Sequence, residues 1–389
     1  MTTVKMVKLG TLIKPAKLQK CGNDDYPVLS MTMHNGLVFQ SDKFKKSVAS
    51  QDKSTYKVVH RNQLVIGFPI DEGVLATQRI TDAGIVSPAY GIWDVDQIKI
   101  IPEFLEYALR CNRAIDYYKA KLRGSTARRR SLPTPTLLEL DVPLPDIEQQ
   151  KLALTTIHHA KNALDSRQAQ LTKLDELIKA RFVEMFGDML LNSLEWPEKP
   201  LEGLADIVSG ITKGRKTTET GLIEVPYMAV SNVKSGYIDW TTIKTILATK
   251  QEIEQYRLMP DDILMTEGGD PDKVGRGAII KNPLENSIHQ NHIFRVRLYE
   301  SELLPAYFAE YLQHQKAKRY FLGCAKQTTG IASINMRQLR ALPVLIPPLS
   351  LQNQFADFVA EVDKSKVEVQ KALDQTQLLF DSLMQQYFG

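Results

Sequence analysis

The chain has 389 residues, of which 43% are hydrophobic and 24% charged, a composition typical of a globular protein with room for two or three domains. It has no apolar run long enough to span a bilayer, and its first ten residues, MTTVKMVKLG, lack an apolar signal core. We therefore expect no membrane span and no secretion, and a cytoplasmic protein. Cys21, Cys111 and Cys324 are too scattered for a metal or disulfide framework and are expected to be thiols.

The net formal charge of +4 is unevenly distributed along the chain. Residues 1–145 contain 21 Lys and Arg against 14 Asp and Glu, and residues 197–347 contain 19 against 17. Residues 146–196 and 348–389 are acidic instead, with 6 against 8 and 3 against 6. Basic globular segments next to acidic helical ones fit nucleic-acid contact by the former and protein contact by the latter. A random distribution of surface charge explains these counts equally well.

The first segment, residues 1–145, mixes short β-rich runs with helical patterns. PEFLEYALRCNRAIDYYKAKL (102–122) predicts a helix that begins at Pro102, because proline suits the first helical turn. Thr134 and Pro135 are predicted to cap a short helix that ends before VPLP (142–145). We therefore expect an α+β domain over residues 1–145.

The second segment, residues 146–196, contains one long predicted helix that continues without Gly or Pro to Gly187. Its apolar residues recur every seven positions, with one on an interleaved line, as in a coiled-coil seam rather than the face of a globular helix. The predicted seam residues are Ile157, Leu164, Leu171, Leu174 and Ile178.

The remaining residues repeat this arrangement. In residues 197–347, VPYMAV and DDILMT predict strands, PAYFAEYLQHQKAKRYFL (305–322) predicts a helix, and Asn335 is a predicted N-cap. Residues 348–389 predict a second long helix that needs a partner, and an intrachain one is the simplest choice. Its predicted seam residues are Val362, Val369 and Leu383 on one line, and Ala372 and Leu379 on the companion line.

The two halves align at an offset of about 200 residues, which is right for a duplicated domain. Tyr56 aligns with Tyr256 and Leu64 with Leu264. LLELDVPLP (137–145) and LRALPVLIP (339–347) share Leu, Leu, Val and Pro at an offset of 202. The sequence therefore predicts two tandem α+β domains, each followed by a long helix.

Loops rich in Arg, Lys, Thr, Asn and Gln are candidates for DNA contact, because these side chains hydrogen-bond base edges and neutralise phosphates. For each residue the alternative is a solvated loop side chain. The candidates are Ser125, Thr126, Arg128, Arg129 and Arg130 in GSTARRRS; Lys213, Arg215 and Lys216 in TKGRK; Lys273 and Arg276 in DKVGRG; Gln290 and Asn291; and Lys326, Gln327, Thr328 and Thr329 in KQTTG.

Other chemistry has weaker support. His289 and His292 could form a metal pair, but no Cys or carboxylate partner stands at motif spacing, so a polar cluster facing DNA or a strand edge is favoured. GGDPDKVGRG is neither a P-loop nor a dinucleotide-binding fingerprint, and no methyltransferase motif or Ser/His/Asp arrangement is present. We expect no catalytic residues, no metal site and no cofactor on this chain.

LLELDVPLPDIEQQ (137–150) and LRALPVLIPPLSLQNQ (339–354) resemble the domain-exit motif of the specificity subunits of type I restriction-modification systems. SGITKGRK (209–216), DDILMTEGGDPDKVGRGAII (261–280) and QTTGIASINMRQL (327–339) look like further segments of that family, and the resemblance covers essentially the whole chain. Two departures are visible: the first copy has no clear Gly-Arg-Gly loop, and LQNQ replaces Glu-Gln in the second.

The resemblance implies a non-catalytic DNA-specificity subunit with target-recognition domains at residues 1–145 and 197–347. The helices of residues 146–196 and 348–389 would pair as an antiparallel intrachain coiled coil and set the distance between two half-sites in double-stranded DNA. The subunit would hold two modification subunits that methylate adenine with S-adenosylmethionine, and could recruit restriction subunits. Two alternatives are a self-contained DNA-modifying enzyme and a coiled-coil assembly protein without a nucleic-acid role.

Overall fold

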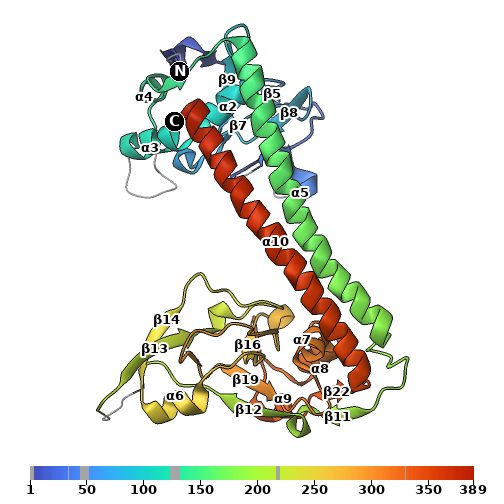
Figure 1. Cartoon of the computed structure of the whole chain (residues 1–389). Coiled ribbons are helices and arrows are strands. Elements are labelled where there is room, and N and C mark those ends of the chain that lie inside the picture. Colours follow the sequence, from blue (N-terminus) through green and yellow to red (C-terminus); the bar gives the residue numbers. More distant parts are fainter. Residues whose placement is uncertain (1–3, 34, 44–51, 123–131, 216–219, 329) are drawn as a thin grey trace. The chain divides into compact units, whose positions relative to one another are not determined.

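The computed structural model describes residues 4–33, 35–43, 52–122, 132–215, 220–328 and 330–389. The chain divides into two compact units (Figure 1). Unit 1 comprises Met1–Gln168 and Lys371–Gly389, and unit 2 comprises Ala169–Gln370. Each unit therefore contains one α+β domain together with one end of each long helix. The predicted segment boundaries at residues 145, 196 and 347 stay predictions.

Unit 1 is built around the four-stranded antiparallel sheet β2-β9-β6-β7, with the two-stranded pairs β1-β10, β3-β4 and β5-β8. Its strands are β1 (Met6–Lys8), β2 (Ile13–Pro15), β3 (Leu29–Thr32), β4 (Gly36–Phe39), β5 (Lys57–His60), β6 (Leu64–Ile66), β7 (Leu75–Thr77), β8 (Ala83–Val86), β9 (Gly91–Val95) and β10 (Asp141–Pro143). Its helices are α1 (Gln40–Lys43), α2 (Pro102–Arg110), α3 (Asn112–Lys121), α4 (Thr134–Leu138) and the first part of α5 (Ile147–Phe186).

Unit 2 is built around the sheet β12-β19-β15-β17, with the sheets β14-β13-β18 and β16-β21-β20 and the pair β11-β22. Its strands are β11 (Glu198–Pro200), β12 (Ala205–Ser209), β13 (Ile223–Met228), β14 (Lys244–Ala248), β15 (Ile263–Thr266), β16 (Gly268–Gly269), β17 (Gly277–Ile279), β18 (Ile288–His289), β19 (Ile293–Leu298), β20 (Lys326–Thr328), β21 (Ile331–Ser333) and β22 (Pro343–Leu345). Its helices are α6 (Lys250–Tyr256), α7 (Pro305–Tyr311), α8 (Gln315–Cys324), α9 (Met336–Arg340) and the first part of α10 (Leu349–Phe388).

The predicted internal repeat is present in the strand order. β2, β6, β7 and β9 of unit 1 occupy the same places in their sheet as β12, β15, β17 and β19 of unit 2. The pair β1-β10 corresponds in the same way to β11-β22, and the helices α2, α3, α4 and α5 follow in the order of α7, α8, α9 and α10. The two-domain α+β architecture predicted from the sequence is confirmed.

Three details of the predicted helices are wrong. The helix predicted over residues 102–122 is interrupted at Cys111, whose backbone is extended (φ −70°, ψ 161°), so that α3 folds back and buries Ala114 and Tyr118. Its counterpart over residues 305–322 is also two helices, α7 and α8, and His314 caps the second. Thr134 is not an N-cap, because α4 starts at Thr134 itself and Pro133 takes the capping position. Asn335 does cap α9, and its side chain accepts a hydrogen bond from the Gln338 amide (2.9 Å).

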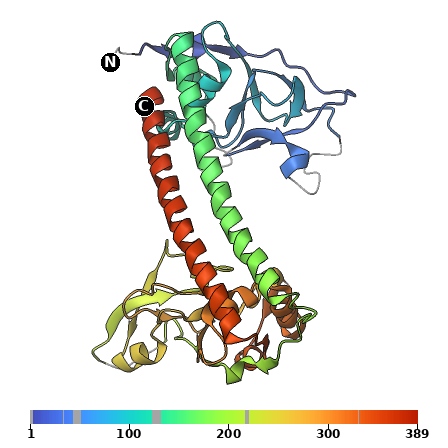
Figure 2. The same cartoon turned by 45° about the vertical axis from the view of Figure 1, so that its right-hand side comes forward.

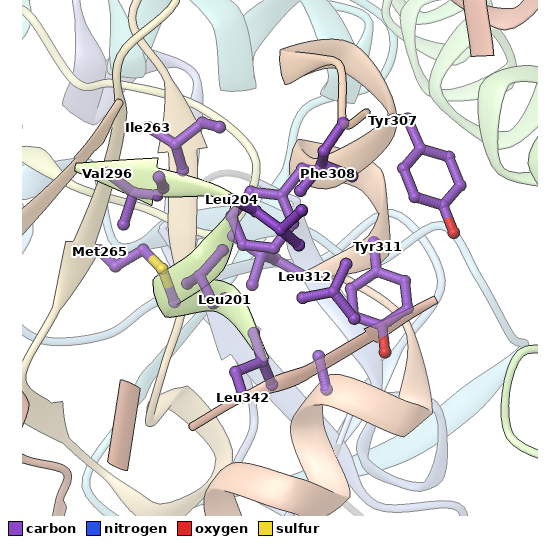
Figure 3. Close-up of a cluster of buried hydrophobic side chains, with 14 of the residues drawn as sticks. Leu201, Leu204, Ile263, Met265, Val296, Tyr307, Phe308, Tyr311, Leu312 and Leu342 are labelled. Carbon is purple, nitrogen blue, oxygen red and sulfur yellow. The ribbon is translucent and has the colours of Figure 1, made fainter. Parts of the chain in front are cut away.

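The hydrophobic core of unit 2 fills the space between its main sheet and α7 (Figure 3). Strand β15 is buried along its whole length, as its apolar run ILMT requires. From α7, Phe308 and Leu312 lie toward Leu204 of the sheet layer, and Tyr307 and Tyr311 donate hydrogen bonds to the carbonyls of Leu345 and Pro343. This ties α7 to β22, the strand that leads into α10.

A buried glutamine fixes the start of each long helix to its domain in the same way. Gln150 in α5 donates from Nε2 to the carbonyls of Lys99 and Pro145, and its Oε1 accepts from the amide of Ile101, the residue before α2. Gln352 in α10 makes the equivalent three bonds with Glu302, Pro347 and Leu304, the residue before α7. Both side chains are fully buried, and they stand 202 positions apart, the offset of the repeat.

The ends of the long helices are buried equivalently. In unit 1 the ring of Phe388, at the end of α10, packs on Phe104 of α2 with centroids 4.9 Å apart. In unit 2 the ring of Phe186, at the end of α5, packs on Tyr307 of α7 at 4.8 Å. Each domain therefore binds the beginning of one long helix and the end of the other, which makes the two helices antiparallel (Figures 1 and 2).

The predicted coiled-coil seam residues differ in burial between the two helices, and the seam itself stays a prediction. In α5, Ile157 and Ile178 are buried, and Leu164, Leu171 and Leu174 are half-buried. In α10, Val362 is buried and Val369, Ala372 and Leu383 are half-buried, but Leu379 is 54% exposed. In a heptad repeat, the second apolar position can lie three or four residues after the first. In α10 the residues at the four-residue spacing, Leu373 and Phe380, are half-buried, whereas Leu379, at the three-residue spacing, is exposed. Within the described residues no helix has the length and apolarity needed to cross a membrane.

Candidate nucleic-acid interface

The predicted DNA-contacting loops of unit 2 start from neighbouring strands. The segment that leads into TKGRK forms a parallel bridge between Ile211 and Gln290, with hydrogen bonds from the Ile211 amide to the His289 carbonyl (2.9 Å) and from the Asn291 amide to the Ile211 carbonyl (3.1 Å). The Glu267 amide in turn donates a hydrogen bond to the carbonyl of His292 (3.0 Å). The loops after residues 211, 266 and 289 therefore lie side by side.

The loop containing KQTTG joins the same group through the small sheet β16-β21-β20. β16 pairs Gly268 with Ser333 and Gly269 with Ala332, and β21 pairs Ser333 with Lys326. The Ile334 amide also donates a hydrogen bond to the Glu267 carbonyl (2.8 Å). The register thus brings four loops, distant in sequence, to one surface. We call it the loop surface, and it comprises residues 211–215, 267–276, 289–292, 326–328 and 330–333.

Some predicted residues on the loop surface expose their charged or polar ends. Lys213, Lys326 and Gln327 are exposed. Lys273 is exposed and pairs with Asp270, and this hydrogen-bonded ammonium lowers the pKa of the Asp270 carboxyl. Exposed lysine side chains such as these are suited to neutralising DNA phosphates.

Arg276 is half-buried, unlike the exposed lysines. Its carbonyl accepts a hydrogen bond from Thr266, and its buried Nε has no hydrogen-bond acceptor among the described residues. The preceding Gly275 has φ 67°, and a Cβ there would lie 2.2 Å from the ring of Phe321. Glycine is therefore required at this position to let the loop pack against α8.

Two predicted residues use their side chains inside the protein. The Arg215 guanidinium pairs with Glu252 and reaches the Leu247 carbonyl (3.4 Å), which attaches the loop to α6. The Gln290 side chain accepts a hydrogen bond from the Val230 amide (3.3 Å). Both residues therefore stabilise the loop surface. Contact with DNA stays a prediction for these two residues and for the other candidates of the loop surface.

The first-domain candidates Ser125, Thr126, Arg128, Arg129 and Arg130 lie outside the described residues, as do Lys216 and Thr329. Thr328 belongs to β20. Asn291 is half-buried, and its Nδ2 lies 3.4 Å from Nε2 of His292.

The two histidines that suggested a metal pair have opposite environments. His289 is fully buried, and burial lowers its pKa to about 4, so the ring is neutral at ordinary pH. His292 has a side chain that is 57% exposed and pairs with Glu267. Among the described residues no three His, Cys, Asp or Glu side chains are grouped to hold a metal ion. No short motif marks Glu267 in the sequence, because it is the strand register that brings it to His292.

Each unit also contains a cleft beside its long helices. In unit 1 a cleft of about 950 Å³ lies between α2, α5 and α10, and in unit 2 a cleft of about 1010 Å³ lies between α7, α5 and α10. Tyr107 and Glu310 line the two clefts at the same place in α2 and α7. Phe380 and Ile178, 202 positions apart, do so from the long helices. The two clefts are equivalent under the internal repeat.

The linings of the two clefts differ in chemistry. In unit 1, Glu103 binds both Arg79 (2.6 Å) and Nε2 of His158 (2.9 Å). In unit 2, Tyr237 and Trp240 are exposed at the cleft, and burial raises the pKa of the Glu310 carboxyl. The two clefts are therefore equivalent in position but not in the chemistry of their linings.

Comparison with known proteins relates the chain to DNA-specificity proteins. The family model for the type I restriction modification DNA specificity domain matches residues 193–376. A putative type I restriction enzyme specificity subunit, MjaX, of Methanocaldococcus jannaschii is 26% identical over 182 residues, 46% of this chain and 42% of that protein. The EcoKI specificity subunit of Escherichia coli is 22% identical over 266 residues, 64% of this chain and 57% of that protein. The chain spans about half the length of these curated relatives.

Solved structures share the fold. A chain from a study of complex assembly and conformational transition in a type I restriction-modification system superposes with a TM-score of 0.59 at 15% identity, covering 99% of this chain and 97% of that one. The type I restriction-modification S subunit from M. genitalium gives a TM-score of 0.55 at 14% identity, covering 100% of this chain and 97% of that one. At these identities the similarity concerns the fold alone.

Proposed function

We propose that this chain, which belongs to the family of type I restriction-modification DNA specificity subunits, recognises a bipartite sequence in double-stranded DNA. Each domain reads one half-site, and the chain itself carries no catalytic residue. The observation that carries the proposal is the duplication: two domains with the same strand order, each fixed to the long helices by the same glutamine bonds.

The loop surface supports DNA contact by the second domain. Four polar loops converge there, with exposed lysines around a group of hydrogen-bonding side chains. Lysines supply affinity through phosphates, and hydrogen-bonding side chains supply sequence preference through base edges. The corresponding reading loops of the first domain, including Arg128 to Arg130, stay a prediction from sequence.

The long helices support a fixed spacing between the half-sites. Each has 40 residues, which corresponds to about 60 Å at 1.5 Å per residue. Half-sites on successive turns of DNA are separated by roughly 34 Å. A helix pair of this length is sufficient to hold two reading domains on successive turns, once the size of the domains is included.

The equivalent clefts support two copies of a protein partner. We propose that these partners are modification subunits, that they bind S-adenosylmethionine and transfer its methyl group to adenine, and that restriction subunits can join the assembly. The role of this chain is then to position the partners, since the clefts lie against the helices that link the reading domains.

The proposal is tested by mapping methylated adenines in DNA exposed to the chain together with its modification subunits. The expected result is one split motif with a constant gap. Methylation that follows no sequence motif would contradict sequence reading. S-adenosylmethionine binding by the isolated chain would contradict the non-catalytic assignment and support a self-contained enzyme.

A further inference from the structure

Glu267 and His292 form a hydrogen-bonded pair on the loop surface. Glu267 directly follows β15 and His292 directly precedes β19, and the two strands pair Thr266 with Ile293. This register places the side chains together, with Oε2 of Glu267 2.6 Å from Nδ1 of His292. Both remain accessible, because 34% of the carboxylate side chain and 57% of the imidazole side chain are exposed.

The partners of this pair define what it offers to a ligand. The short contact requires the Nδ1 hydrogen of His292 to be donated to Glu267. Nε2 of His292 lies 3.4 Å from the amide nitrogen of Asn291. The second oxygen of the Glu267 carboxylate is an acceptor whichever hydrogens the ring carries. Toward solvent, the pair therefore presents a carboxylate acceptor that the imidazole holds in place.

The charge of the pair argues against a phosphate ligand. A carboxylate 2.6 Å from the imidazole repels a phosphate oxygen, whereas Lys213 and Lys326 are exposed on the neighbouring loops and suited to phosphates. A carboxylate acceptor on a surface that also exposes lysines fits a base edge that offers a donor. In the major groove only the N6 amino group of adenine and the N4 amino group of cytosine are donors.

We propose that Glu267 and His292 read the exocyclic amino group of an adenine or a cytosine in the half-site bound by the second domain. Glu267 accepts a hydrogen bond from the amino group, and His292 orients the carboxylate. Guanine and thymine present only acceptors at these positions, so the pair rejects them. This inference rests on the proposed function. It adds the residues that discriminate between bases and the hydrogen bond by which they do so.

The test uses the complete chain with its modification subunits and the split motif found by methylation mapping. Binding is measured to duplexes in which one adenine is replaced by purine, or one cytosine by 2-pyrimidinone, each of which lacks only the amino group. For the wild-type chain, one such replacement in one half-site should weaken binding by about 5- to 150-fold. Whether that position holds adenine or cytosine identifies the base.

The variant His292→Ala should lose this sensitivity, so that the same replacement no longer weakens its binding, while recognition of the other half-site is unchanged. Glu267→Ala should behave in the same way, and combining both changes should add little to either. Glu267→Gln keeps an oxygen that accepts the Nδ1 hydrogen and should restore part of the discrimination, which a merely structural role would not do.

A matched control is Glu302→Ala, which removes another exposed carboxylate of unit 2, paired with Lys199. It should leave every base preference intact. The inference is overturned if His292→Ala binds all duplexes more weakly by the same factor and with a smaller salt dependence, because that describes a phosphate contact. It is also overturned if His292→Ala keeps the wild-type sensitivity at every position. A wild-type complex without any sequence preference would instead refute the proposed function itself.

Discussion

Replacing Gln352 by alanine should selectively weaken the attachment of α10 to the second domain. The change removes three hydrogen bonds of a fully buried side chain and leaves the Leu304 amide and the carbonyls of Glu302 and Pro347 without that partner. A hydrogen bond contributes a net 0.5–1.5 kcal/mol or so, and an unsatisfied buried group costs about 1–3 kcal/mol. The expected loss for unit 2 is about 2–4 kcal/mol.

Hydrogen exchange measures this loss at the residues concerned. Since each 1.4 kcal/mol or so is a factor of ten, amides around Leu304 should exchange about 30- to 1000-fold faster in Gln352→Ala than in the wild type. The control is Gln354→Ala, which removes an exposed glutamine of the same helical turn and should change stability by less than about 0.5 kcal/mol. Equal exchange rates in the two variants would show that the buried glutamine does not hold the domain to the helix.

Three further predictions concern other parts of the molecule. Phe388→Ala should destabilise unit 1 by about 3–5 kcal/mol, because the ring is buried against Phe104, and urea denaturation should show it; a loss below about 1 kcal/mol would mean that the end of α10 is not needed there. Lys326→Ala should reduce the slope of log affinity against log salt by about 1 without changing the motif, and an unchanged slope would exclude a phosphate contact. Burial raises the pKa of Glu310, so the stability that this group contributes is present at low pH and lost as the pH rises through its raised folded value. Glu310→Gln should therefore stabilise unit 2 at neutral pH and change little in acid, and a variant less stable at neutral pH would contradict this sign.

The duplicated architecture could be predicted from sequence because its signals are local and appear twice. The exit motifs, the heptads and the capping Asn335 each depend on residues close together in the chain. The same local patterns did not reveal the break at Cys111, because the apolar spacing continues across it. They did not choose between the lines of Leu379 and Phe380 either, because only the partner helix decides which line faces inward.

The candidate site could be predicted only in part. Composition identified loops suited to DNA, but the residues of the loop surface are brought together by strand register. Glu267 and His292 stand 25 positions apart and meet because β15 and β19 pair. Composition also does not reveal that Arg215 pairs with Glu252, since an arginine in a glycine-containing loop gives the same signal whether it faces solvent or α6.

The central claim is that two equivalent domains read two half-sites at a distance set by the long helices. It is tested by inserting seven residues into α5 between Gln168 and Ala169 together with seven into α10 between Gln370 and Lys371, where both helices pass from one unit to the other. Seven residues preserve the heptad and lengthen each helix by roughly 10 Å, close to three base pairs of DNA. Methylation mapping of the reconstituted complex should find both half-sites unchanged and the gap between them longer by about three base pairs. An unchanged gap with both half-sites still recognised would contradict the claim.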